Sequence, residues 1–435
     1  MRSLASVALT IGAASLFAGC GGSASPPIGV QGVAQQMNGV SAHPLNTAGY
    51  KLLYSFKGSS DGDTPFAGLI FVKGMLYGTT AYGGNVSSYC NSGNGCGTVF
   101  RMSTTGSKTV IYTFKGGSDA TDPVVPLFDL NGTLYGTTQT GGSGCVSRGG
   151  CGTVFTITTS GAESVLYSFK GGSDGSGPFA SLIAVNGKLY GTTGGGGGST
   201  RCAGGCGTVF EMNMSGKERI LHRFTGPGHD GENPIGALVA VNGELYGTTW
   251  VGGRGPCNYG CGTIFEVSTS SGKERVVHDF AGAPDGENPE GGLVDVGGKL
   301  YGTTIAGGTS GACPKAYGCG TFFQLTPSST SENYSVIYSF LGGRNSAFPN
   351  GGLLPLNGIF YGTASGGNRC GYYYRCGTVF DVTTSGKERL LHRFHSQGQE
   401  PKSPGWPLVA RNGLIYGTTV AGGASNLGAV YSIEP

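Results

Sequence analysis

Twelve of the thirteen cysteines occur as six close pairs, and this spacing has the most definite chemistry in the sequence. Each pair lies at the same point of a repeat, just before a segment that reads GTVF or a close variant. Such pairs predict a disulfide framework in an oxidising compartment. Zinc is the alternative, but no pair has a recurring histidine or a second pair in its repeat to complete four ligands. The pairs are Cys90 with Cys96, Cys145 with Cys151, Cys202 with Cys206, Cys257 with Cys261, Cys313 with Cys319, and Cys370 with Cys376.

An aspartate also recurs, in the loop that precedes the first strand of most repeats. It stands a few residues ahead of a proline, and this spacing predicts a side chain that caps its own turn. A ring of calcium sites that also uses Asp63, Glu232 or Glu287 is the alternative, but each loop offers few ligands. The recurring aspartates are Asp61, Asp119, Asp174, Asp230 and Asp285.

The sequence contains no recognisable catalytic centre. No histidine recurs beside a serine or cysteine as a triad would require. His222, His278 and His392 replace a tyrosine at one position of the fourth strand, which predicts a packing or hydrogen-bonding role. Charged residues make up 12% of the chain and the net charge is +3, a balance that does not favour nucleic acid. We therefore predict no catalytic residue, no cofactor and no metal site.

Residues that break the repeat are the candidates for ligand binding. Trp250 occupies a position held elsewhere by Ala, Gln, Gly, Ile, Ser or Val, and Trp406 one held by Ala, Val or Gly. Every charged residue in the loops that contain the cysteines is basic. Aromatic rings beside arginines suit sugar faces, carboxylated glycans or a protein partner, and the alternative is that these rings pack the loops. The predicted ligand-binding residues are Tyr82, Tyr89, Trp250, Arg254, Tyr259, Tyr372, Tyr373, Tyr374, Arg375 and Trp406.

A tandem repeat must position all of these side chains. The phrase LYGTT, or a close variant, recurs seven times at intervals of 55 to 60 residues. In one unit, segments 237–241, 244–249, 262–268 and 275–280 predict four antiparallel strands, and an Asn-Gly turn joins the first two. Four short strands per unit are typical of a propeller blade.

The two ends of the repeat region predict how the ring closes. KLLYSF at 51–56 matches the fourth strand of a blade, whereas AVYSI at 429–433 matches the third. We therefore predict an all-β, seven-bladed propeller whose N-terminal strand completes the C-terminal blade. The cysteine loops and the loops before each first strand then emerge on one face, called here the cysteine-loop face, where we expect function and where Trp406 would plug or floor the channel mouth.

The repeats resemble those of kelch-type propellers and, more closely, those of the bacterial GloVer tandem-repeat proteins. The resemblance rests on units such as GGLVDVGGKLYGTTIAGG at 291–308, and it covers residues 50–435. It implies an exported protein with a surface anchor and no settled activity. The cysteine pairs are an addition to the plain motif, and the seventh repeat lacks one.

The N-terminus predicts export and a lipid anchor. Residues 1–20 resemble a lipoprotein signal, in which Phe17-Ala18-Gly19-Cys20 forms the lipobox and Cys20 becomes lipidated; an ordinary secretory signal is the alternative. Residues 21–49 read as a flexible tether, and 50–435 as the propeller. Gly21 lacks the inner-membrane retention signal, so the outer membrane or cell surface is the expected location, with the membrane contacted only through the anchor.

We favour a binding module that recognises an extracellular glycan or an envelope protein through the cysteine-loop face. The first alternative is a propeller glycosidase or polysaccharide lyase, which would need two loop carboxylates at a suitable separation. The second alternative is a structural envelope protein. The carboxylates available to an enzyme are Asp63, Glu232, Glu287, Glu290 and Glu400.

Overall fold

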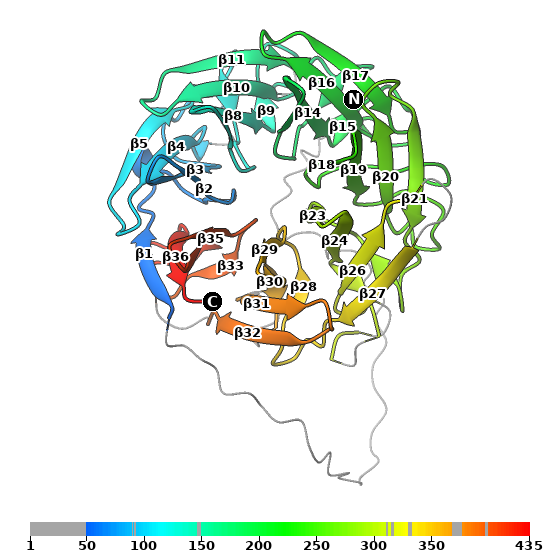
Figure 1. Cartoon of the computed structure of the whole chain (residues 1–435). Helices are drawn as coiled ribbons and strands as arrows, with labels where there is room; N and C mark the ends of the chain where they lie inside the picture. The colour runs from blue at the N-terminus through cyan, green and yellow to red at the C-terminus, as the bar shows by residue number, and fades with distance from the viewer. Residues whose placement is uncertain are drawn as a thin grey trace, which may run out of the picture.

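The computed structural model describes residues 49–88, 90, 93–145, 149–309, 312–314, 317–328, 333–367, 376–395 and 399–435. These residues form a ring of seven antiparallel sheets around a central axis, viewed along that axis in Figure 1. The predicted all-β, seven-bladed propeller is confirmed. The one helical element in these ranges is a 3-10 turn, η1 (Ser59–Asp61), and none of their helices is long and apolar enough to cross a membrane.

The strands of a blade follow one another from the axis outward in chain order. The innermost strands are β2 (Ile70–Val72), β7 (Phe128–Leu130), β13 (Ile183–Val185), β18 (Val239–Val241), β23 (Val294–Val296), β29 (Leu354–Leu356) and β34 (Val409–Arg411). The second strands are β3 (Met75–Thr80), β8 (Thr133–Thr138), β14 (Lys188–Thr193), β19 (Glu244–Thr249), β24 (Lys299–Thr304), β30 (Ile359–Gly366) and β35 (Leu414–Ala421).

The outer half of each blade is built in the same way. The third strands are β4 (Thr98–Met102), β10 (Thr153–Thr158), β16 (Thr208–Asn213), β20 (Thr263–Ser268), β26 (Thr321–Thr326), β31 (Thr378–Thr383) and β36 (Ala429–Ile433). The outermost strands are β5 (Lys108–Thr113), β11 (Glu163–Ser168), β17 (Glu218–Arg223), β21 (Glu274–Asp279), β27 (Asn333–Ser339), β32 (Glu388–Arg393) and β1 (Lys51–Ser55).

Short segments of the loops before the first strands pair with the ends of the second strands or with the residues that follow them. They are β6 (Ala120–Thr121) with β9 (Thr140–Gly141), β12 (Gly175–Ser176) with β15 (Gly195–Gly196), β22 (Gly286–Glu287) with β25 (Ala306–Gly307), β28 (Ala347–Pro349) with β30, and β33 (Lys402–Pro404) with β35. In the fourth blade, the first strand starts at Val239 rather than at the predicted 237. Gly236, at the entry to this strand, lies so close to Thr248 Oγ1 that an added methyl group would be 2.5 Å away.

The ring closes between the two ends of the described chain. β1 pairs antiparallel with β36, and Lys51 lies opposite Ser432 in the register. In Figure 1 the blue strand β1 therefore forms the outer edge of the red blade that contains β35 and β36. The predicted closure by the N-terminal strand is confirmed.

The LYGTT and GTVF phrases pack against each other inside every blade. In the first blade, Thr80 and Thr98 share a hydrogen bond between their hydroxyl groups at 2.8 Å. Gly78 has to be small, because a Cβ at this position would lie 2.7 Å from the ring of Phe100. The other threonine, Thr79, donates to the carbonyl oxygen of Pro123 in the next blade at 2.8 Å. The phrases therefore serve the blade itself and its contact with the next.

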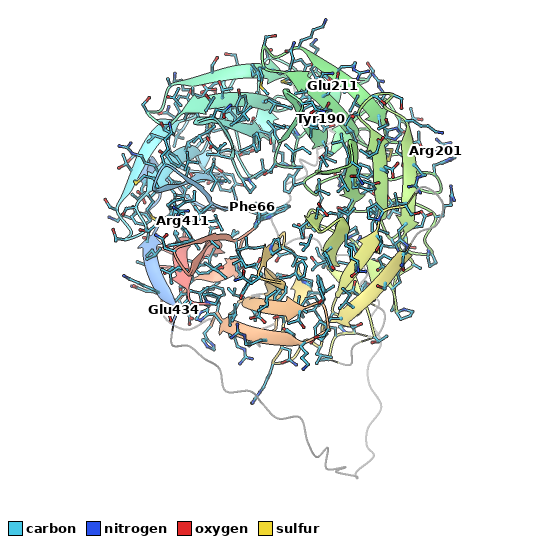
Figure 2. All side chains as sticks on the ribbon, viewed as in Figure 1. Phe66, Tyr190, Arg201, Glu211, Arg411 and Glu434 are labelled. Carbon is cyan, nitrogen blue, oxygen red and sulfur yellow. A yellow bond between two sulfur atoms is a disulfide. The ribbon has the colours of Figure 1, made fainter. Side chains whose placement is uncertain are left out.

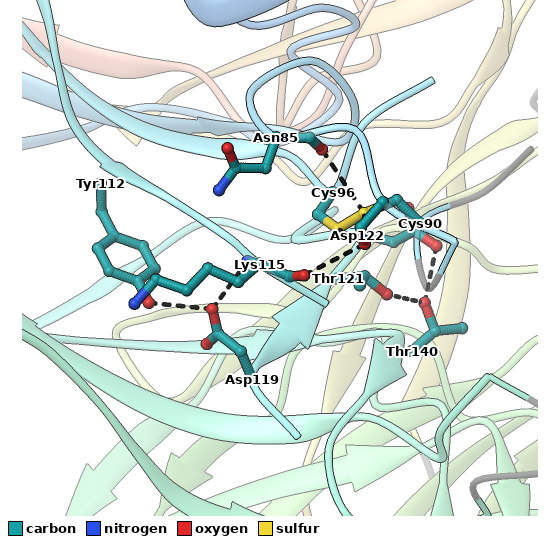
Figure 3. Close-up of a disulfide and its surroundings, with 10 residues drawn as sticks. Asn85, Cys90, Cys96, Tyr112, Lys115, Asp119, Thr121, Asp122 and Thr140 are labelled. Atoms are coloured by element: carbon teal, nitrogen blue, oxygen red, sulfur yellow. Dashed lines mark hydrogen bonds between the residues drawn. A yellow bond between two sulfur atoms is a disulfide. The ribbon is translucent and has the colours of Figure 1, made fainter. Parts of the chain in front are cut away.

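The second cysteine of each pair also joins neighbouring blades. In Figure 3, the carbonyl oxygen of Cys96 accepts a hydrogen bond from the backbone N–H of Asp122, at 3.3 Å, in the loop that leads to the second blade. Asp122 has a φ of +56°, a left-handed conformation that Asp, Asn and Gly adopt more readily than other residues. The corresponding residue has a positive φ in every blade; the seven are Thr64, Asp122, Gly177, Asn233, Asn288, Phe348 and Ser403.

Five of the six predicted disulfides are present among the described residues. Cys376 is also disulfide-bonded, and its predicted partner, Cys370, lies outside the described residues. Disulfides in this number indicate an extracellular or envelope location. The five are Cys90–Cys96, Cys145–Cys151, Cys202–Cys206, Cys257–Cys261 and Cys313–Cys319.

The recurring aspartates cap their turns, as predicted. Asp119 accepts a hydrogen bond from the backbone N–H of Lys115 at 2.8 Å and another from the hydroxyl of Tyr112 at 3.0 Å (Figure 3). Two of the histidines that replace this tyrosine make the same contact: His222 Nε2 lies 3.0 Å from Asp230 Oδ2, and His278 Nε2 lies 3.1 Å from Asp285 Oδ2. The third, His392, has no hydrogen-bond partner for its ring nitrogens among the described residues and stacks on Tyr50 instead.

The N-terminal predictions concern residues that the structure does not describe. The signal segment 1–20 with Cys20, and residues 21–48 of the tether, lie outside the described ranges. The description begins with Gly49, immediately before the propeller. The lipidation of Cys20 and the tether therefore stay predictions.

Candidate binding site at the channel mouth

One residue in each blade, directly after the loop proline, forms a ring at the mouth of the central channel on the cysteine-loop face. Phe66, the member from the first blade, lies close to the axis in Figure 2. Four neighbouring members are apolar, two are polar and one is glycine, so the ring has an apolar arc and a polar arc. The ring, called the mouth ring below, is Phe66, Val124, Phe179, Ile235, Glu290, Asn350 and Gly405.

The apolar arc forms the base of a hydrophobic cluster that spans the axis. Trp406, next to Gly405, fills the gap in the ring; it is 6% exposed, and its ring centre lies 5.9 Å from that of Phe66 and 5.5 Å from that of Phe179. These three residues come from the seventh, first and third blades. The axial cluster consists of Phe66, Ala81, Val124, Val125, Phe179, Ile235 and Trp406, with Tyr82, Trp250 and Val420 packed against it.

Three of the predicted ligand-binding residues therefore meet in the axial cluster. They are Tyr82 from the first blade, Trp250 from the fourth and Trp406 from the seventh. Trp406 is buried, whereas Tyr82 and Trp250 are partly exposed. The position of Trp250 is fixed by its carbonyl oxygen, which accepts a hydrogen bond from Asn288 Nδ2 at 2.9 Å.

Two further predicted residues lie farther along the cysteine loop of the fourth blade, outside the axial cluster. The backbone N–H of Arg254 donates to Asp279 Oδ1 at 2.8 Å, and Tyr259 is 76% exposed. Tyr89, Tyr372, Tyr373, Tyr374 and Arg375 lie outside the described residues.

A cavity of about 120 Å³ lies on the axis beside the buried side of the axial cluster. Trp406 and Phe179 form part of its wall, and residues at or just before the start of the inner strands of six blades form the rest. Its lining is almost wholly apolar, with residues such as Leu293 and Leu353. The cavity is smaller than the roughly 300 Å³ at which pockets for small molecules begin. Trp406 therefore packs at the channel mouth with a small apolar cavity beside it.

The polar arc consists of Glu290 and Asn350, in the fifth and sixth blades. The backbones after these residues touch, because a methyl group on Gly291 would lie 2.8 Å from the carbonyl oxygen of Gly351. Burial raises the pKa of Glu290 from 4.5 to about 7, and among the described residues it has no hydrogen-bond or ion-pair partner. Asn350 Oδ1 is likewise buried without a hydrogen-bond partner in the described part of the chain. Two hydrogen-bonding groups at the mouth are therefore unused.

Of the basic residues of the cysteine loops, Arg201 and Arg254 lie among the described residues, and neither belongs to the mouth ring. Arg201 lies at the outer edge of the ring in Figure 2, and Arg254 is exposed. Of the seven positions in the mouth ring, only Glu290 can carry a charge. The mouth can therefore accept hydrogen bonds from hydroxyl groups beside an aromatic surface, and its seven ring positions include no basic side chain.

Several residues at the mouth were not predicted from the sequence. Phe66, Phe179 and Asn350 were not predicted as site residues, and Glu290 was named only as a carboxylate that an enzyme could use. The sequence does contain a signal for these residues: the proline recurs in all seven loops, whereas the residue after it varies in type.

The other loop carboxylates are not members of the mouth ring. Asp63 and Glu232 form isolated bridges with Tyr82 and Val251, and Glu287 belongs to the short strand β22. Glu400 lies 3.4 Å from His392 Nε2. Of these candidates, only Glu290 occupies the mouth ring.

Comparison with solved structures finds proteins that are only distantly similar to this chain. A gluconolactonase from Xanthomonas campestris has 12% identity and a TM-score of 0.38, with 69% of this chain and 82% of that chain covered. A putative 6-phosphogluconolactonase from Bacteroides fragilis has 14% identity and a TM-score of 0.46, with 82% of this chain and 94% of that chain covered. These likenesses are too remote to assign an activity.

Comparison at the level of sequence gives a clearer result. No curated protein matches the chain. The family model described as the Gloeobacter/Verrucomicrobia repeat matches residues 32–204 and 198–431, which together span most of the sequence. The predicted GloVer membership is confirmed: this chain belongs to the Gloeobacter/Verrucomicrobia repeat family.

Proposed function

We propose that the protein is a binding module whose site is the outer surface of the axial cluster together with Glu290 and Asn350. The observation that supports this proposal is the meeting of Tyr82, Trp250 and Trp406 at the channel mouth. These three residues break the repeat in separate blades, and the ring brings them together. The equivalent positions of the other blades hold no aromatic residue.

The chemistry of the mouth favours a neutral sugar unit of an extracellular glycan. Partly exposed Tyr82 and Trp250 offer aromatic faces to the C–H surface of a sugar ring, while buried Trp406 supports them from below. Glu290 and Asn350 supply acceptors for sugar hydroxyl groups. Arg254 and Tyr259 would contact parts of a longer glycan that extend outward along the fourth blade. An aromatic anchor of an envelope protein could use the same surface, and binding experiments distinguish the two ligands.

Retention of the purified protein on neutral polysaccharides, acidic polysaccharides and envelope protein fractions tests the proposal. Replacing both Tyr82 and Trp250 with alanine should weaken binding roughly 30-fold, since an aromatic hot spot contributes about 2 kcal/mol. Tyr317→Ala is the matched control, because Tyr317 is 52% exposed in the cysteine loop of the fifth blade and outside the proposed site. Binding that survives the double replacement would place the site elsewhere; no retention on any fraction would favour a structural envelope protein.

An enzyme is the second candidate, because Glu290 has a pKa of about 7 at the channel mouth. A carboxyl group with this pKa can donate or accept a proton near neutral pH. The mouth ring holds no second carboxylate, whereas most glycosidases need a pair. The chemistry open to this site is therefore acid–base catalysis by one carboxyl group.

Product release from the same polysaccharide panel tests this second candidate. Glu290→Gln should abolish turnover and leave retention largely intact, since glutamine keeps an acceptor oxygen at this position. Turnover that is unaffected by Glu290→Gln would exclude Glu290 as the catalytic group.

We also propose that Cys20 is lipidated and that residues 21–49 tether the propeller to the outer membrane or cell surface. The lipobox Phe17-Ala18-Gly19-Cys20 supports this proposal. Cys20→Ala should move the protein from the detergent phase to the aqueous phase on partitioning. A detergent-phase protein that keeps this behaviour after the replacement would contradict the proposal.

A further inference from the structure

The outer edge of the ring repeats one polar arrangement at the seams between blades. At five seams a tyrosine or histidine on the outermost strand of one blade meets the loop aspartate, and a residue at the start of the next blade's outermost strand lies beside them. The identity of this third residue differs from seam to seam. The seams therefore serve as internal comparisons for one another.

At two other seams, a lysine or a tyrosine hydroxyl contacts the loop aspartate. Between the seventh and first blades the third residue is Lys108, whose Nζ lies 2.9 Å from Asp61 Oδ1. Between the second and third blades it is Glu218. Here the hydroxyl of Tyr167 lies 3.0 Å from Asp174 Oδ2 and 3.4 Å from Glu218 Oε2, so one O–H serves both acids.

One seam has a histidine at the position of Tyr167 and a tyrosine at the position of Glu218. Between the fourth and fifth blades, His278 Nε2 contacts Asp285 Oδ2 at 3.1 Å. The third residue, Tyr334, stacks on the imidazole with ring centres 3.7 Å apart. This seam therefore has a single carboxylate, that of Asp285, beside the imidazole of His278.

The seam between the third and fourth blades combines one imidazole with two carboxylates. His222 Nε2 lies 3.0 Å from Asp230 Oδ2, and a ligand atom of Glu274 completes a trio whose members all lie within 4.8 Å of one another. Asp230 is 8% exposed. Glu274 Oε1 is buried and has no hydrogen-bond partner among the described residues. This seam has no tyrosine hydroxyl and no lysine at these three positions, and the basic groups that face Glu274 are His222 and Arg254.

We propose that His222, Asp230 and Glu274 bind a divalent transition-metal ion, with Zn²⁺ as the preferred one. Zinc takes one imidazole nitrogen and carboxylate oxygens at roughly 2.0 to 2.2 Å, which sets tetrahedral ligand atoms about 3.3 Å apart. The contact of 3.0 Å between His222 and Asp230 is close to this value, and the ligand atom of Glu274, which lies within 4.8 Å of both, would move toward them. Calcium and magnesium are disfavoured, because they take oxygen ligands and more of them.

The bound ion would join two blades. His222 lies on β17 of the third blade, Asp230 on the loop that enters the fourth, and Glu274 at the start of β21, the outermost strand of the fourth. A water molecule would take the fourth zinc position. The site lies at the outer edge of the propeller, and its proposal does not depend on the proposed binding function at the channel mouth.

Zinc binding to the full-length protein without a histidine tag tests the proposal, with bound metal measured by atomic emission after equilibrium dialysis. The wild type should hold one zinc ion per chain. His222→Tyr recreates the trio of Tyr167, Asp174 and Glu218, and Glu274→Tyr recreates the seam of His278 and Tyr334. Both variants should therefore fold, and both should lose the bound ion.

A gain of function provides the complementary test. Tyr167→His places an imidazole beside Asp174 and Glu218 and should raise the content to two zinc ions per chain. His229→Ala is the control for incidental binding, because His229 is exposed and adjacent to Asp230 but outside the trio; its zinc content should stay at one. Zinc should also raise the melting temperature of the wild type and leave that of His222→Tyr unchanged.

Two results would overturn the proposal. The first is a wild-type protein that holds no zinc on dialysis. The second is a zinc content that persists in both His222→Tyr and Glu274→Tyr while both variants show the wild-type circular dichroism spectrum.

Discussion

Replacing Glu290 with glutamine should stabilise the protein above neutral pH. Burial in the channel mouth raises the pKa of Glu290 from 4.5 to about 7, so the folded state holds its proton more tightly than the unfolded state does. Glu290 therefore contributes most stability below pH 4.5, and this contribution is lost as the pH rises to about 7. The difference in pKa corresponds to about 3 kcal/mol, and partial hydration of the side chain reduces the expected gain to about 2 kcal/mol.

Urea unfolding of the wild type and of Glu290→Gln at a series of pH values measures this effect. The difference in the free energy of unfolding should be small near pH 4.5, grow through neutrality and level off above pH 8. Glu218 and Glu274 also have pKa values raised to about 7, mainly by burial. They are common to both proteins, so their contributions cancel in the difference.

Two outcomes would refute this reasoning about Glu290. A difference that stays flat with pH would show that Glu290 keeps the same pKa on folding. A variant less stable than the wild type at pH 8 would show that a partner in the channel stabilises the charged carboxylate. Either result would also remove the case for Glu290 as an acid–base group.

Two further replacements test how the ring is built. Trp406→Ala should lower the free energy of unfolding by about 3 to 5 kcal/mol, because it empties the centre of the axial cluster. Urea unfolding at pH 7 measures this loss. A loss below about 1 kcal/mol would contradict the plug role. Thr64→Asn should raise the free energy of unfolding by about 1 kcal/mol, because Thr64 has a φ of +56° that asparagine adopts at lower cost. Thermal unfolding measures this gain. Thr64→Val is the control, and it should melt at a lower temperature than the wild type.

The repeat made the fold predictable from the sequence. The Asn-Gly turns, the LYGTT phrases and the position of KLLYSF gave the blade, the number of blades and the closure by β1. These features could be predicted from the sequence because each depends on neighbouring residues within one repeat or on the number of repeats. The ends of the inner strands were less accessible, since crowding near the axis at Gly236 decides where pairing can begin.

The channel mouth was predictable only in part. Trp250 and Trp406 stood out because they break the repeat, but their packing depends on Phe66 and Phe179, which come from other blades. The contacts of Trp406 depend on these neighbours, which a sequence does not place together. The trio of His222, Asp230 and Glu274 was missed for the same reason, because its members belong to two blades and meet only across their seam.

The pairing of β1 with β36 has a consequence for how the chain is made. The first strand to be synthesised is the outer edge of the last blade, so it has no partner until the final strand has been made. A nascent chain, or one truncated before Ala429, holds its other blades in an open arc with unpaired strand edges. The propeller is therefore completed in a single late step, and loss of a few C-terminal residues should expose the chain to proteolysis at both of its ends.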